Sequence, residues 1–103
     1  MENKFELFIY YLVLNNRKKK YNDVYTLTRV LSMWFGLYNS RDISLDLLSK
    51  GLIERGIGDN PIYLMTEKGN AIIKKDFEFY LFDLVKRYPD KIQEIELLAS
   101  RLE

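Results

Sequence analysis

Lysine, arginine, carboxylate and tyrosine side chains are the groups of this chain that could do chemistry, because its 103 residues include neither histidine nor cysteine. This composition removes imidazole general bases, thiolate nucleophiles, disulfides and nearly all zinc sites. No potential nucleophile has a recognisable base beside it in the sequence, and a nucleophile without such a base is weak. We therefore expect no catalytic residues and no enzymatic activity.

Two patterns resemble ligand sites but have simpler explanations. Gly51, Gly56 and Gly58 give the spacing Gly-x-x-x-x-Gly-x-Gly, but the Lys-Ser/Thr pair of a phosphate-binding loop does not follow them. Three carboxylates could offer oxygen ligands to a hard cation, but spacings of two and five residues do not converge on one helix face. These are Asp76, Glu78 and Asp83. We expect a turn at the glycines, and neither a cofactor nor a metal.

One dense basic run follows the first expected helix. It consists of Arg17, Lys18, Lys19 and Lys20. Such a run either forms a solvated loop or contacts DNA phosphates without reading base sequence, and both interpretations stay open. The net charge of the chain is only +1, so the chain is not of the class that binds nucleic acid by overall charge alone.

Residues 43–73 predict the elements that must position these groups. Apolar residues at helical spacing run up to Lys50, and Gly51 follows as a left-handed stop. In such a stop, Leu52 packs against Leu47. The chain should therefore leave the helix directly into an extended segment.

A β-hairpin and a new helix are expected next. Residues 52–55 and 62–65 are short extended runs on either side of a turn rich in glycine, aspartate, asparagine and proline. Thr66 can then cap a helix, with the negative charge of Glu67 in its first turn.

This order of motifs resembles a known family. Lys-Gly-Leu-Ile-Glu-Arg at residues 50–55, a turn, and Tyr-Leu-Met-Thr-Glu-Lys-Gly at residues 63–69 are together similar to the winged helix-turn-helix proteins, particularly bacterial and archaeal regulators of the MarR and PadR type. The resemblance implies a recognition-type helix followed by a β-hairpin wing. It also implies a dimeric DNA-binding protein that regulates transcription.

The rest of the chain predicts further helices around this stretch. Residues 4–14 form one that is apolar on almost every face, so it is either wrapped by its own chain or meets a second chain. A second helix begins at a cap supplied by Asp23 or Thr26 and ends near Phe35. Ser40 is expected to cap the third, recognition-type helix.

A long fourth helix is predicted over residues 66–88, roughly 35 Å, and a fifth begins at Asp90 in a capping-box pattern. Their apolar faces need partners, either elsewhere in this chain or in a second copy. We expect one domain over residues 1–103, mainly α (α+β), with a core at about 4–75 and a C-terminal helical extension at about 76–103.

The outward face of the third helix leaves the kind of partner open. It holds Asp42, Asp46, Ser49 and Lys50. A helix that enters the DNA major groove usually presents Arg, Lys, Asn or Gln there. Residues 41–68 contain five acidic and four basic residues, so this region is slightly acidic. The alternative to DNA is therefore a protein-interaction module whose acidic face docks a basic partner.

The DNA hypothesis assigns contacts to ten residues. These are Arg17, Lys18, Lys19, Lys20, Arg41, Ser44, Ser49, Lys50, Arg55 and Asn60. A homodimer interface would use Phe8, Tyr11, Phe79, Phe82, Ile95 and Leu98. We expect double-stranded DNA and a second copy as partners, and a cytoplasmic location. No membrane span is expected, because the apolar run at residues 7–14 is too short and no small-residue cleavage site follows it.

Overall fold

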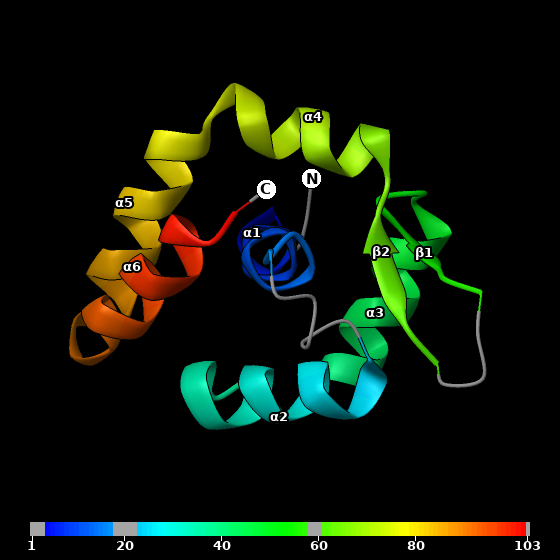
Figure 1. Cartoon of the computed structure of the whole chain (residues 1–103), viewed down its shortest axis with the longest axis horizontal. Coiled ribbons are helices and arrows are strands. Elements are labelled where there is room, and N and C mark those ends of the chain that lie inside the picture. Colours follow the sequence, from blue (N-terminus) through cyan, green and yellow to red (C-terminus); the bar gives the residue numbers. More distant parts are fainter. Residues whose placement is uncertain (1–3, 18–22, 58–60, 103) are drawn as a thin grey trace.

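The computed structural model describes residues 4–17, 23–57 and 61–102. Within them the chain is mainly helical with one small antiparallel sheet, as expected (Figure 1). The elements are α1 (Lys4–Leu14), α2 (Val24–Phe35), α3 (Ser40–Ser49), β1 (Ile53–Arg55), β2 (Tyr63–Met65), α4 (Glu67–Lys75), α5 (Phe77–Arg87), the short 3-10 helix η1 (Pro89–Lys91) and α6 (Ile92–Ser100).

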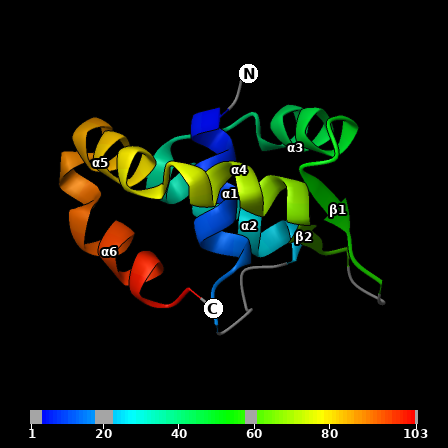
Figure 2. The same ribbon diagram turned by 90° about the horizontal axis from the view of Figure 1, so that it is seen from above.

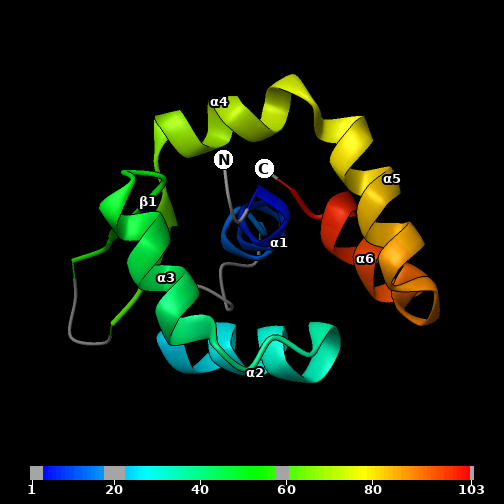
Figure 3. The same ribbon diagram turned by 180° about the vertical axis from the view of Figure 1, so that it is seen from behind.

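Helix α1 is the centre of the molecule. Every residue from Leu7 to Leu14 is buried, and Figures 1 and 3 show α1 nearly end-on with the other elements around it. A helix that is apolar on every face needs cover on every face, and this chain supplies that cover itself. Phe8 is 0% and Tyr11 is 7% exposed. The expectation that these two side chains contact a second copy is therefore corrected.

Local sequence signals set the ends of α2. The Asp23 carboxylate accepts a hydrogen bond of 2.9 Å from the Thr26 backbone N–H. Of the two expected capping residues, Asp23 is therefore the one that caps α2. Gly36 ends it at φ 68°. The cap expected for α3 is wrong, because Ser40 is the first helical residue rather than the residue before the helix. Asn39 occupies the cap position without a side-chain hydrogen bond.

The end of α3 has the geometry that its sequence predicts. Gly51 has φ 70°, the Leu52 N–H donates to the Leu47 carbonyl at 3.0 Å, and the Gly51 N–H donates to the Leu48 carbonyl at 3.1 Å. These two bonds define the Schellman motif. Leu47 and Leu52 are both buried, so this helix end is also part of the core.

The hairpin is fixed to the helices on both sides. Its register pairs Ile53 with Met65 and Arg55 with Tyr63. An isolated bridge joins Asp23 to Ile62, and it ties the start of α2 to β2. The expected cap of α4 is confirmed, since the Thr66 hydroxyl accepts from the Gly69 N–H at 3.1 Å.

The single long helix expected over residues 66–88 is wrong. The chain breaks at Asp76, where φ is −128° and ψ is 34°, into α4 and α5. Ile73 of α4 and Leu84 of α5 are both fully buried. The ring of Phe77 lies edge-on to the ring of Phe8, with 5.5 Å between the ring centroids. A straight helix touches α1 along one line only, whereas the bent pair wraps around it.

The C-terminal helix folds back onto the same core. Ile95 and Leu98 are 0% and 1% exposed, and the Arg17 N–H donates to the Arg101 carbonyl at 2.7 Å. The assignment of Ile95 and Leu98 to a dimer interface is therefore corrected, because both lie in the interior. The capping-box start at Asp90 is also wrong, because α6 has no side-chain cap. Residues 76–103 were expected as an extension, but their described part belongs to the same core cluster.

Candidate nucleic-acid interface

Helix α3 lies at the surface between α2 and the hairpin (Figures 2 and 3). Its inner side is held by Ile43 and Leu47, which are 5% and 0% exposed. Its outer side presents Arg41, Asp42 and Leu45 to solvent. The helix is thus anchored on one side and available to a partner on the other.

A cavity of about 370 Å³ lies between α2, α3 and the hairpin. Its lining combines two arginines, several hydroxyl groups and an apolar wall, and no carboxylate lines it among the residues that the structure describes. The lining residues are Val24, Leu27, Thr28, Ser40, Arg41, Ser44, Leu45, Arg55, Pro61 and Tyr63. We refer to this hollow as the arginine cavity.

Arg41 and Arg55 reach the arginine cavity from different elements. Arg41 stands in the first turn of α3. Arg55 ends β1 and shares a strand face with the buried Ile53, because alternate residues of a strand point the same way. Both arginines are exposed, and neither forms an ion pair among the residues that the structure describes. They give the arginine cavity two positive charges that no described carboxylate neutralises.

Ser44 does not lie where the DNA hypothesis placed it. It is 4% exposed, and its hydroxyl lies 2.6 Å from the Tyr10 hydroxyl. Tyr10 also donates to the Ser40 carbonyl at 3.2 Å, and either hydroxyl of the Tyr10–Ser44 pair can be the donor in the shorter bond. Burial raises the pKa of Tyr10 to about 12. The assignment of Ser44 to a base edge is corrected: its hydroxyl joins α3 to α1.

Lys50 and Ser49 lie at the other end of α3 from the arginine cavity. The Lys50 ammonium is 2.9 Å from the Asp46 carboxylate, which offsets its charge. The Ser49 hydroxyl donates to the Asp46 backbone carbonyl at 2.7 Å. Both side chains remain partly or fully exposed, but they do not join Arg41 and Arg55.

The basic run is only partly described. Arg17 is exposed, and its guanidinium donates to the Ser100 carbonyl at 3.3 Å. It follows the C-terminal end of α1 and does not line the arginine cavity. The other expected contacts lie outside the described residues. They are Lys18, Lys19, Lys20 and Asn60.

Several residues of the arginine cavity were missed from the sequence. Thr28, Ser40 and Tyr63 come from three separate elements, and no spacing along the chain links them. The one available signal was the hairpin, since pairing of the two strands sets Tyr63 opposite Arg55. The Tyr10–Ser44 bond spans 34 positions and leaves no local trace in the sequence.

Two of the six expected dimer residues remain at the surface. Phe79 and Phe82 on α5 are 67% and 71% exposed. Phe79 also lines an open groove of about 560 Å³, whose lining includes Lys4, Asp83 and Arg87. The α5 face is therefore apolar at its centre and carries charges of both signs nearby.

In the described part of the chain, no helix has the length and apolar character that crossing a bilayer needs. Comparisons with protein-family models, curated protein sequences and solved structures find no match to this chain.

Proposed function

We propose that this chain is a winged-helix DNA-binding protein of the MarR and PadR type, acting as a small dimeric regulator of transcription in the cytoplasm. The order α1, α2, α3, β1 and β2 supports the winged arrangement, as does the bridge from Asp23 to the hairpin. The observation that favours DNA is the convergence of Arg41 and Arg55 in a cavity whose described lining residues include no carboxylate. A guanidinium group is well suited to phosphate oxygens.

The charge pattern indicates how the protein would contact a duplex. The outer side of α3 presents Asp42 beside Arg41, and Asp46 already pairs with Lys50. A carboxylate facing the major groove repels phosphate, and of the base edges only cytosine offers it a favourable hydrogen bond. We therefore propose that the arginines contact the DNA backbone from the α3 and hairpin side. Specificity would then depend on few direct base contacts and on DNA shape.

Fluorescence anisotropy tests this proposal. The wild-type protein is titrated onto a duplex from its own upstream region and onto a scrambled duplex, at low and at physiological salt. We expect tighter binding to the native duplex and a loss of affinity with salt. Arg41→Gln and Arg55→Gln should each weaken binding to DNA. Each should also reduce the slope of log affinity against log salt concentration by about one.

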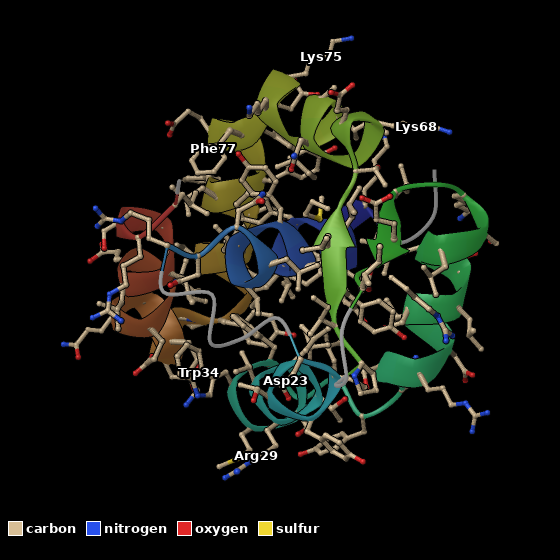
Figure 4. The ribbon with its side chains drawn as sticks, turned by 45° about the vertical axis from the view of Figure 1, so that its right-hand side comes forward. Asp23, Arg29, Trp34, Lys68, Lys75 and Phe77 are labelled. Carbon is tan, nitrogen blue, oxygen red and sulfur yellow. The ribbon has the colours of Figure 1, made fainter. Side chains whose placement is uncertain are left out.

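The matched control is Arg29→Gln. Arg29 is an exposed arginine that points outward from α2 (Figure 4) and does not line the arginine cavity. This variant should bind DNA with nearly the wild-type affinity and slope. Absence of wild-type binding to either duplex at low salt would overturn the proposal.

A specific surface favours the second candidate function, docking of a basic protein. Asp42 is exposed, and Leu45 beside it is 48% exposed, so the outer side of α3 combines an apolar contact with negative charge. Substitution of both Asp42→Lys and Asp46→Lys separates the two functions. It should strengthen DNA binding if the proposal is right, and it should release a protein partner if α3 docks one.

A further inference from the structure

We propose that the arginine cavity binds a small organic phosphate monoester, with its phosphate on the two arginines and its substituent on the apolar wall. This proposal deepens the function proposed above, because it assigns a soluble ligand to residues that would also contact DNA. The binding itself is independent of DNA and can be measured on the protein alone.

The polar part of the arginine cavity is suited to a doubly charged anion. Arg41 and Arg55 supply two guanidinium groups, and Thr28 and Ser40 add hydroxyl groups. The Asn39 side chain does not cap the N-terminus of α3, so the positive end of that helix adds to the potential. A phosphate monoester carries a charge of about −1.5 to −2 at neutral pH, whereas a DNA phosphodiester carries only one charge per phosphate. The monoester therefore neutralises both arginines at once.

The apolar part of the arginine cavity argues for an organic substituent. Val24, Leu27, Leu45 and Pro61 line it, and the ring of Tyr63 adds a further face. The volume of about 370 Å³ lies within the range of small-molecule sites, which is roughly 300–1,000 Å³. Free inorganic phosphate would leave this wall uncovered. In DNA the groups beside each phosphate are polar sugars, which gain little from such a wall.

The shared residues imply regulation. A phosphate monoester on Arg41 and Arg55 would remove the two charges that we propose for the DNA backbone, and it would occupy the space between α3 and the hairpin. The ligand and the duplex should then exclude each other. This competition rests on the proposed DNA-binding function, but occupancy of the cavity does not.

Isothermal titration of the full chain without DNA tests occupancy. The probes are phenyl phosphate, inorganic phosphate, benzoate, phenol and the dinucleotide TpT, whose single phosphate is a diester. We expect saturable binding of phenyl phosphate, at least tenfold weaker binding of inorganic phosphate, benzoate and TpT, and none of phenol. No saturable binding of phenyl phosphate would overturn the proposal. Equal binding of TpT would overturn the choice of a monoester over the DNA backbone.

Variants localise the ligand. Arg41→Gln and Arg55→Gln should each lower the affinity for phenyl phosphate at least tenfold, while Arg29→Gln should leave it unchanged. Both cavity arginines are exposed, so circular dichroism should show an intact fold in each variant. Unchanged affinity in both Arg41→Gln and Arg55→Gln would overturn the location of the site.

Competition separates the failure of this proposal from the failure of DNA binding. Phenyl phosphate added to the protein–duplex complex should lower the anisotropy, and phenol should not. If the protein binds phenyl phosphate but no duplex, the cavity assignment stands and the DNA function fails. If it binds the duplex and phenyl phosphate does not displace it, the competition is overturned.

Discussion

At the scale of single residues, Tyr10 is the connection between the central helix and α3. Its hydroxyl contacts both the Ser44 hydroxyl and the Ser40 carbonyl. Tyr10→Phe removes both hydrogen bonds while keeping the ring, so we expect a loss of about 1–2 kcal/mol in the free energy of unfolding. Urea denaturation measures it. Tyr25→Phe is the control, because Tyr25 is 78% exposed and should change stability by no more than about 0.5 kcal/mol.

The same tyrosine predicts a pH dependence in the alkaline range. Burial raises the pKa of Tyr10 from 10.0 to about 12, so the folded state keeps the hydroxyl protonated where the unfolded state ionises. Stability is therefore fully present below pH 10 and is lost as pH rises from about 10 to 12. The loss from this residue is on the order of 2–3 kcal/mol.

Comparison with Tyr10→Phe isolates this contribution. Burial also raises the pKa values of Tyr11, Tyr80 and Tyr88, but these three residues are present in both proteins. Urea denaturation from pH 8 to pH 11.5 should show a steeper loss in wild type than in the variant. Parallel curves would mean that Tyr10 ionises as easily in the folded protein as in the unfolded one.

Residue identities predicted the local contacts and missed the distant ones. Asp23 and Thr66 cap helices, and Leu52 follows Leu47 in the stop motif, because each arrangement depends on neighbours within six positions. Ser44 was misplaced because its burial depends on Tyr10, which belongs to another helix. Composition and periodicity along one helix cannot report which of its polar residues meets a buried partner.

At the scale of elements, Gly69 shows how closely α4 packs against the α3–β1 connection. A methyl group at this position would overlap the Leu52 carbonyl oxygen, a backbone atom. Helix propensity alone predicts that Gly69→Ala stabilises by about 1 kcal/mol, whereas overpacking costs about 3 kcal/mol. We therefore expect a net loss of about 2 kcal/mol, measured by urea denaturation.

Gly51→Ala is the companion variant. A methyl group there meets no atom within 4 Å, but the residue has φ +70°, which costs roughly 1 kcal/mol for an L-residue. The larger loss should therefore belong to Gly69→Ala, although Gly51 has the unusual backbone. A stabilised Gly69→Ala protein would contradict the close approach of α4 to Leu52.

The break between α4 and α5 was not predictable from local signals. Neither glycine nor proline lies near Asp76, and the apolar periodicity continues through it. Of the two apolar stripes that suggested a second chain, the one that contains Ile73 and Leu84 is buried within this chain, whereas Phe79 and Phe82 of the other stay exposed. Whether this segment forms one straight helix or two depends on the surface of α1 that it packs against. That surface forms only when the core assembles, so the local sequence cannot report it.

At the scale of the whole molecule, the elements from α2 to α6 enclose the N-terminal helix α1 (Figures 1 and 3). The Cα radius of gyration is 12.5 Å, close to the value of about 13 Å for a folded chain of this length. Periodicity correctly predicted where most helices lie. It could not distinguish an apolar face that meets the same chain from one that meets a second copy, because the two faces have the same composition.

The remaining exposed apolar face predicts a dimer of limited strength. Phe79 and Phe82 are 67% and 71% exposed, and at about 200 Å² per ring they offer roughly 300 Å². A stable interface needs about 800 Å² from each partner. The interface must therefore also include the charged side chains around Phe79 and Phe82. Lys4, Asp83 and Arg87 line the groove beside Phe79. Arg87 and Asp83 already form an ion pair within the chain at 3.2 Å, and this pair can meet its symmetry copy across a two-fold axis.

Light scattering after size-exclusion chromatography tests this dimer. We expect wild type to dimerise in a concentration-dependent way, and the double variant Phe79→Glu with Phe82→Glu to be monomeric. Both positions are exposed, so this variant should unfold at nearly the wild-type urea concentration. Tyr38→Glu alters an equally exposed aromatic residue elsewhere, at 83% exposure, and should leave the dimer intact. A monomeric wild type at concentrations that saturate the duplex would mean that one copy binds DNA alone, and the expected operator would then be a single half-site rather than two related by symmetry.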